Sequence, residues 1–235
     1  MDASDGGMTA YAALLARHAQ ERGVDYLGWR QERALFAGVL DAIAAARPDH
    51  LSTPREPLAF WLNAYNAICV LGVLDRLPLP SVNTVPGFFS RTRYRVAGAN
   101  RTIDEVERQA RACGDYRAHF ALTCASRGAP PLRNEPYAAE RLEAQIEDQG
   151  RRWLADPRHG CRLDPAARVV WVSRIFHWSS PDLIRSRLPN TLVAPWLSRR
   201  ILATIQPYLA EGDRFQLANG RWRLRYLPYD WALNR

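Results

Sequence analysis

The chain has 235 residues, of which 47% are hydrophobic and 24% charged, and its formal net charge is +8. This length and composition are typical of a globular chain that buries its own core, and they exclude a largely disordered protein. All 32 basic residues are arginines, so chemistry that needs a lysine Schiff base or the lysine of a phosphate-binding loop is excluded.

The first third of the chain is predicted to be helical. Residues 1–7 are expected to be disordered, and apolar residues then recur at helical spacing over 8–22 and 30–46. A third helix is predicted from Pro54 to about position 76, because proline favours the first position of a helix. This helix is apolar on every side, which predicts that it lies buried at the centre of the fold.

Two amides interrupt that apolar helix. Asn63 and Asn66 lie three residues apart and therefore share one face. A buried amide without partners costs about 1–3 kcal/mol, so both side chains must be hydrogen-bonded. They are expected either to brace the backbone of an adjoining loop or to line a site.

The middle of the chain is predicted to hold short strands and one helix. Residues 93–96 and 100–103 have the pattern of a hairpin around Gly98, and residues 104–112 have that of a helix with an acidic first turn. The apolar segment 119–124 is predicted to be a buried strand that ends in a turn.

The last third mixes both kinds of element. Helices are predicted over 136–154 and 195–209, with a hairpin over 162–172. Asn219 and Gly220 form a strong type I′ turn signal, which predicts a terminal hairpin. Residues 222–226 alternate arginine with aromatic or aliphatic side chains, as a half-buried strand does.

Helices dominate these predictions, and the strands are short and close in sequence. The chain is therefore expected to be α+β: mostly helical, with a buried central helix and a small antiparallel sheet of short hairpins. We find no repeat or linker, so residues 1–235 are expected to form a single domain.

A histidine and a thiol stand out in the apolar segment before the central turn. His119 and Cys124 lie five residues apart, and a neighbouring histidine would lower the pKa of the thiol and favour its reactive thiolate form. On a regular strand the two side chains point to opposite faces, so they meet only if the strand bulges; otherwise another histidine, such as His177, must serve. The alternative is that Cys124 is a small core residue and His119 a buried, satisfied histidine.

Four motifs carry a resemblance to a known family. They are residues 119–132 (HFALTCASRGAPPL), 59–67 (AFWLNAYNA), 173–178 (SRIFHW) and 227–234 (LPYDWALN). Together they resemble the family catalogued as domain of unknown function 547, over about residues 54–234. The resemblance implies a domain of bacteria and plants with no settled activity.

The resemblance also bears on single residues. Glu107 matches an acidic position of the family, which implies that it orients His119. Ala129 stands where the family commonly carries a second cysteine, so a dithiol with Cys124 is excluded and a redox role is disfavoured.

Two functions are compatible with these residues. The first is a cysteine-dependent hydrolase or acyl transferase, with Cys124 as nucleophile, His119 as base and Glu107 as the acid that orients the base. The substrate would be a small molecule or a peptide. The side chains expected to bind it are Asn63, Asn66, Ser126 and Arg133. The second is a non-catalytic domain that binds a peptide, a protein partner or a small molecule.

Other ligands and locations are not expected. No cofactor is implied, and no metal is expected because the spacings match no usual zinc pattern for Cys113, His119, Cys124, His159 and Cys161. The arginines are spread along the chain among acidic residues, which disfavours nucleic-acid binding. No stretch approaches the roughly 20 apolar residues of a membrane span, and the first residues lack a signal-peptide pattern, so a cytoplasmic location is expected. Tyr229, Asp230 and Trp231 are expected to pin the terminal hairpin to the core.

Overall fold

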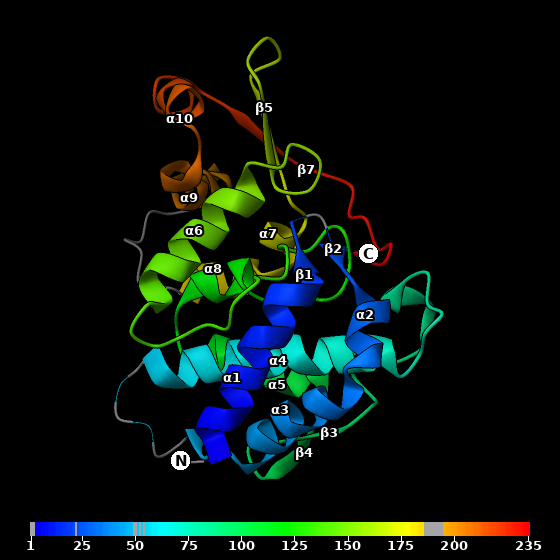
Figure 1. Cartoon of the computed structure of the whole chain (residues 1–235). Coiled ribbons are helices and arrows are strands. Elements are labelled where there is room, and N and C mark those ends of the chain that lie inside the picture. The colour runs from blue at the N-terminus through cyan, green and yellow to red at the C-terminus, as the bar shows by residue number, and fades with distance from the viewer. Residues whose placement is uncertain (1–2, 22, 49–50, 52, 54, 186–194) are drawn as a thin grey trace.

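The structure is a computed structural model that describes residues 3–21, 23–48, 51, 53, 55–185 and 195–235. Its N-terminal half is a cluster of helices (Figure 1). Its helices are α1 (Ala3–His18), α2 (Tyr26–Gln31), α3 (Arg33–Ala45), α4 (Arg55–Leu74) and α5 (Ile103–Ala112), with short strands β1 (Ala19–Gln20) and β2 (Gly23–Val24). Helix α1 begins at Ala3, within the segment expected to be disordered. The helix predicted over 30–46 is broken at Glu32, and Pro54 lies outside the described residues.

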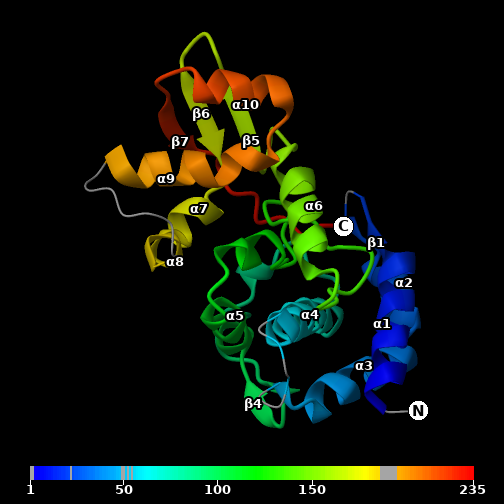
Figure 2. The same ribbon diagram turned by 90° about the vertical axis from the view of Figure 1, so that its left-hand side faces the viewer.

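Helix α4 is the buried central helix that the sequence predicts. It lies between α5 and the pair α1 and α3 (Figure 2), and 15 of its 20 residues are buried. By length and composition alone α4 is apolar enough to cross a membrane, contrary to our expectation, but 83% of its most apolar window is buried inside the protein. Burial of that kind is what the core helix of a globular fold requires.

The first predicted hairpin is confirmed. Strands β3 (Tyr94–Val96) and β4 (Ala99–Arg101) pair antiparallel, and the turn residues Ala97 and Gly98 have φ of 49° and 73°. Two consecutive positive φ values match the twist of antiparallel strands, which is why glycine suits this turn. Helix α5 follows at once, after a capping box between Thr102 and Glu105.

The prediction of a strand over residues 119–124 is wrong. A 3₁₀ helix, η3 (Tyr116–Phe120), occupies its first part, and irregular backbone follows. Asn66 of α4 explains the difference. Its amide donates to the carbonyl of Ala121 at 3.0 Å and accepts from the backbone N–H of Thr123 at 2.9 Å. A side chain therefore supplies the two bonds that a neighbouring strand would supply.

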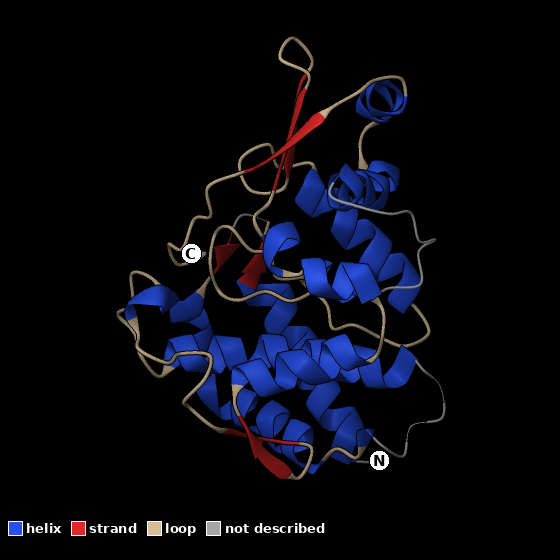
Figure 3. Cartoon of the chain, turned by 180° about the vertical axis from the view of Figure 1, so that it is seen from behind, coloured by secondary structure: helices blue, strands red, loops and turns tan. Residues whose placement is uncertain are grey.

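Among the residues that the structure describes, the C-terminal half combines five α-helices with a three-stranded sheet, and Figure 3 shows their arrangement. Its elements are α6 (Leu142–Leu154), β5 (Cys161–Asp164), β6 (Val169–Val172), α7 (Ile175–Trp178), α8 (Ser180–Arg185), α9 (Pro195–Ile205), η4 (Gln206–Tyr208), α10 (Glu211–Ala218) and β7 (Arg223–Tyr226). The hairpin of β5 and β6 is confirmed. Helix α6 begins later than predicted, because Gln145 bonds the backbone of Pro136 and Ala138 and holds that segment as a loop.

The prediction of a terminal hairpin is wrong. Residues before Asn219 form α10, and Asn219 ends that helix with φ of −100° and a side-chain bond to the carbonyl of Phe215. Strand β7 then pairs in parallel with β6, so the sheet has the order β5-β6-β7 and mixes antiparallel with parallel pairs. The α+β class stands, but this sheet is not made of hairpins alone.

The last residues return to the N-terminal half. After β7 the chain runs down across the molecule to β2 (Figure 1). Ala232 accepts from the N–H of Arg127, Leu233 donates to Pro80, and Asn234 accepts from Val24. The segment 227–235 therefore joins both halves of the fold, which is a wider role than pinning a hairpin.

Candidate functional site

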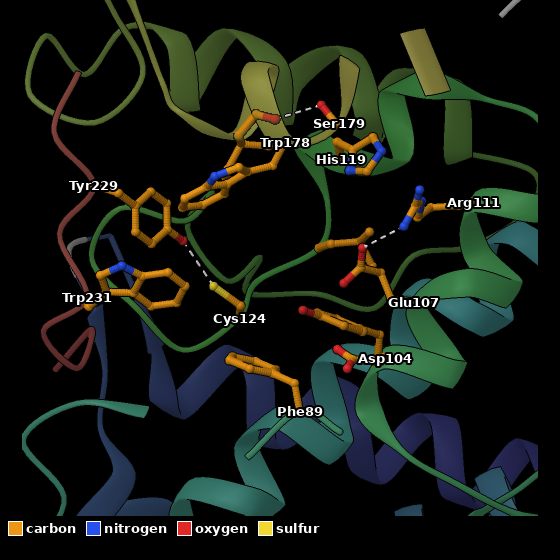
Figure 4. Close-up of a pocket in the computed structure, with 13 residues that line it drawn as sticks. Phe89, Asp104, Glu107, Arg111, His119, Cys124, Trp178, Ser179, Tyr229 and Trp231 are labelled. Carbon is orange, nitrogen blue, oxygen red and sulfur yellow. Dashed lines mark hydrogen bonds and ion pairs between the residues drawn. The ribbon is translucent and has the colours of Figure 1, made fainter. Parts of the chain in front are cut away.

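A cavity of about 210 Å³ lies where α5, the segment after η3, α7 and the C-terminal segment meet (Figure 4). Its lining comes from segments far apart in the chain: Tyr65, Phe89, Asp104, Glu107, Arg111, His119, Leu122, Cys124, Ile175, Trp178, Ser179, Tyr229 and Trp231. The fold therefore brings together the three predicted catalytic residues, Cys124, His119 and Glu107.

Helix α5 supplies the charged wall of the cavity. Asp104, Glu107 and Arg111 follow one another at intervals of three and four residues and so share a helix face. Burial raises the pKa of Glu107, although His119 and Arg111 act in the opposite direction, and burial also raises the pKa of Asp104. The Arg111 guanidinium reaches Glu107 at 3.4 Å. This wall thus holds two carboxyls whose ionised forms are disfavoured.

The Cys124 sulfur belongs to a triangle of neutral groups. It lies 3.1 Å from Oγ of Ser126 and 3.0 Å from the hydroxyl of Tyr229, and these two oxygens are 2.7 Å apart. Burial raises the pKa of the Cys124 thiol, while its bonds with the two hydroxyls oppose that rise. At neutral pH the sulfur is therefore a protonated thiol.

His119 is paired with an acid that the sequence did not indicate. Its Nε2 lies 3.0 Å from Oδ2 of Asp182, and Arg111 holds the same carboxylate with two bonds of 2.5 and 3.0 Å. These bonds, first that of His119 and then those of Arg111, keep the pKa of Asp182 well below its usual range. Asp182, and not the predicted Glu107, is thus the acid that hydrogen-bonds His119.

No hydrogen bond joins His119 to the Cys124 sulfur within the part of the chain that the structure describes. Figure 4 shows His119 toward Arg111 and Ser179, and Cys124 toward Tyr229. The two side chains share the cavity, so the obstacle is not the opposite-face geometry of a strand. The obstacle is that each is held by other partners.

Asn63 and Asn66 do not line the cavity, contrary to the prediction that they bind substrate. Asn63 donates to the carbonyl of Tyr137 at 2.8 Å and accepts from its N–H at 2.9 Å, just as Asn66 brackets Ala121 and Thr123. Both amides brace loop backbone, which was the other alternative.

Three further predicted residues also lie elsewhere. Ser126 is buried in the thiol triangle, behind the cavity wall. Arg133 is bound by Glu135 at 2.8 Å and Asp148 at 2.6 Å. His177 is exposed and packs on the ring of Tyr226.

The cysteines and histidines considered as metal ligands are not grouped as a metal site would require. Among the described residues, no three His, Cys, Asp or Glu side chains are grouped so that they could hold a metal ion. His159, for example, bonds Asp156 at 2.9 Å. The candidate site is therefore the cavity and its own side chains.

An aromatic wall faces the acidic one. Ring centres of Trp178 and Tyr229 are 4.9 Å apart, those of Tyr229 and Trp231 4.6 Å, and those of Trp178 and Trp231 5.8 Å. Two family-like motifs contain these residues, so a signal was present, although we expected the C-terminal one to act only in packing. Arg111 and Asp182 carried no signal, because an ion pair between residues 71 positions apart leaves no pattern in the sequence.

The comparisons with known proteins give one match, to a family model that covers part of the chain. A family model described as protein of unknown function, DUF547, matches residues 48–154. No curated protein and no solved structure matches the chain. The matched segment contains Glu107, His119 and Cys124, whereas Trp178 and Tyr229 lie after it. The resemblance expected from the motifs is thus confirmed over residues 48–154, which match the model of the family of unknown function DUF547, whereas the motifs at 173–178 and 227–234 lie outside the matched segment.

Proposed function

We propose that the protein binds a small, positively charged molecule in the cavity between α5 and the aromatic wall. One observation carries this proposal. Asp104 and Glu107 line the cavity and are weakly paired: within the described residues the Asp104 carboxyl has no hydrogen bond or ion pair, and Glu107 has a single ion pair of 3.4 Å with Arg111, which Asp182 holds more closely at 2.5 Å. A cation bound there would supply the missing charge.

The opposite wall supports the same ligand class. The faces of tryptophan and tyrosine rings attract cations, and Trp178, Tyr229 and Trp231 stand together across from the acids. An acid-lined cavity in a chain of net charge +8 is also unlike the protein as a whole. At about 210 Å³ the cavity is smaller than the roughly 300–1,000 Å³ of drug-sized sites.

Titration calorimetry with a matched pair of probes tests the proposal. Choline carries a quaternary ammonium, and its uncharged isostere dimethylbutanol has the same shape. Choline is expected to bind more tightly than dimethylbutanol, and Asp104→Asn with Glu107→Gln is expected to remove the difference. Glu140→Gln, at an exposed position outside the cavity, is the matched control and should bind as the wild type does. Equal binding of both probes would refute the proposal.

The cysteine hydrolase or acyl transferase remains a second candidate, favoured by one observation. The Cys124 sulfur lies on the cavity between two hydroxyls, and both of them could donate to a thiolate. In this reaction His119, turned from Asp182, takes the thiol proton while the sulfur attacks a carbonyl carbon. The carbonyl carbon then loses its leaving group, which takes the proton from His119, and water or an acceptor cleaves the resulting thioester to restore the thiol.

Iodoacetamide labelling near neutral pH separates the two candidates. Because burial raises the pKa of the Cys124 thiol, we expect it to react more slowly than a free thiol, with Cys124→Ser identifying the labelled site. Faster labelling of Cys124 than of a free thiol would favour the enzyme.

A further inference from the structure

The positive charge of the chain is concentrated in its C-terminal third. Residues 155–235 contain 13 arginines and six acidic residues, so this segment carries +7 of the net charge of +8. The family match ends at residue 154, before this excess begins. In the sequence these arginines lie on separate segments, and the excess is visible only when charges are summed by region.

The sheet gathers several of these arginines on one face. In the register of β5, β6 and β7, Arg162, Trp171 and Arg225 form one row across the three strands. Because side chains alternate along a strand, Arg223 projects on the same side as Arg225. Arg162, Arg223 and Arg225 are exposed, and no ion pair binds any of them among the residues described.

The other face of the sheet is already covered. Helices α9 and α10 lie on one side of the strands (Figures 2 and 3), and Val170, between Leu163 and Leu224 in the next row, is fully buried. The arginine face, which also carries Asp164 and the buried Val169 in the row of Arg223, is thus the one that α9 and α10 leave uncovered.

The ring of Trp171 lies among the arginines. The Arg162 guanidinium lies 5.5 Å from the centre of the Trp171 ring. Trp171 is partly exposed. Flat guanidinium and indole groups are the surfaces on which unstacked bases stack, while arginine side chains also pair with phosphates.

We propose that this face, defined by Arg162, Trp171, Arg223 and Arg225, binds single-stranded nucleic acid. Charge complementarity selects a polyanion, and the stacking groups select one with exposed bases. A duplex hides its bases from a flat sheet, and in the described part of the chain no helix projects from this face to enter a groove. The proposal is independent of the cavity and its ligand.

The proposal is tested by fluorescence anisotropy with a labelled oligothymidylate. A length of about 20 nucleotides is enough to span one such surface. Binding should weaken as salt rises. For the double variant Arg162→Gln with Arg225→Gln, the affinity should fall at least tenfold. The slope of log affinity against log salt should become shallower by roughly 1.4, at about 0.7 for each lost phosphate contact. Trp171→Leu should weaken binding with little change in that slope.

The matched control is Arg30→Gln with Arg95→Gln, which removes the same charge from exposed positions on α2 and β3. It should bind nearly as the wild type does. Equal weakening in the control, tighter binding of a duplex of the same length, or binding of anionic phosphatidylserine vesicles in preference to the oligonucleotide would overturn the proposal. Melting temperatures of all variants establish that each one is folded.

Discussion

Asn66 shows how one side chain can decide the structure of a segment. The run 119–124 has the apolar composition of a strand, but the amide of Asn66 takes both backbone bonds that a strand partner would take. Sequence patterns found the residues of this segment, because a histidine and a thiol in an apolar run are conspicuous. They did not find their partners, since Asp182 and Tyr229 come from distant positions.

Replacing Asn66 by alanine should strongly destabilise the protein. The change leaves the carbonyl of Ala121 and the N–H of Thr123 buried without partners, and each unpaired group costs about 1–3 kcal/mol. Urea unfolding of Asn66→Ala should therefore show a loss of about 2–5 kcal/mol. A loss below about 0.5 kcal/mol, as at a surface site, would contradict the bracing role.

Glu107 should make stability depend on pH. Its pKa is raised in the folded state, so the stabilisation from its protonated form is complete below the unfolded pKa and is lost as pH rises through the folded pKa. Glu107→Gln, which cannot ionise, should melt at a higher temperature than the wild type at about pH 7, and the difference should shrink toward about pH 4. Calorimetric melting over this range measures it, and a pH-independent difference would argue against a raised pKa.

At the scale of elements, local patterns succeeded where partners are close in sequence. The buried helix α4 and the hairpins β3-β4 and β5-β6 follow from apolar periodicity and turn residues within a few positions. The sequence pattern predicted strand β7, but it did not predict that β7 pairs with β6. The residues Asn219 and Gly220 suit a hairpin turn and the end of a helix equally well, and only packing against β6 decides between them.

The connection from α6 to β5 depends on one glycine. A Cβ at Gly160 would lie 1.9 Å from the carbonyl oxygen of Trp153, which no side chain can accept. Gly160→Ala should therefore cost several kcal/mol, on the order of other strained backbone substitutions. Gly38→Ala is the control, because a Cβ there, inside α3, meets no atom within 4 Å and alanine should stabilise the helix by about 0.5–1 kcal/mol. Similar unfolding curves for both variants would contradict the close approach.

At the scale of the molecule, the segment 227–235 is what completes the site. It joins the two halves through backbone bonds and places Tyr229 and Trp231 on the cavity. The sequence could predict most helices. It could not predict the cavity, because its walls come from residues between positions 65 and 231, and long-range packing of this kind has no local signature.

Tyr229 should protect the Cys124 thiol. Truncation of the chain after Leu227 removes the ring that covers the sulfur and the bond between them. The truncated protein should react faster with Ellman's reagent at Cys124 and lose choline binding, whereas Tyr229→Phe should retain the cover and most of the protection. Unchanged thiol reactivity in the truncated protein would show that the segment does not cover the site.

Tyr229 and Trp231 reach the cavity only while the segment 227–235 keeps its backbone bonds to both halves of the fold, so one wall of the cavity depends on contacts made away from it. A ligand bound against that wall therefore also stabilises the union of the two halves.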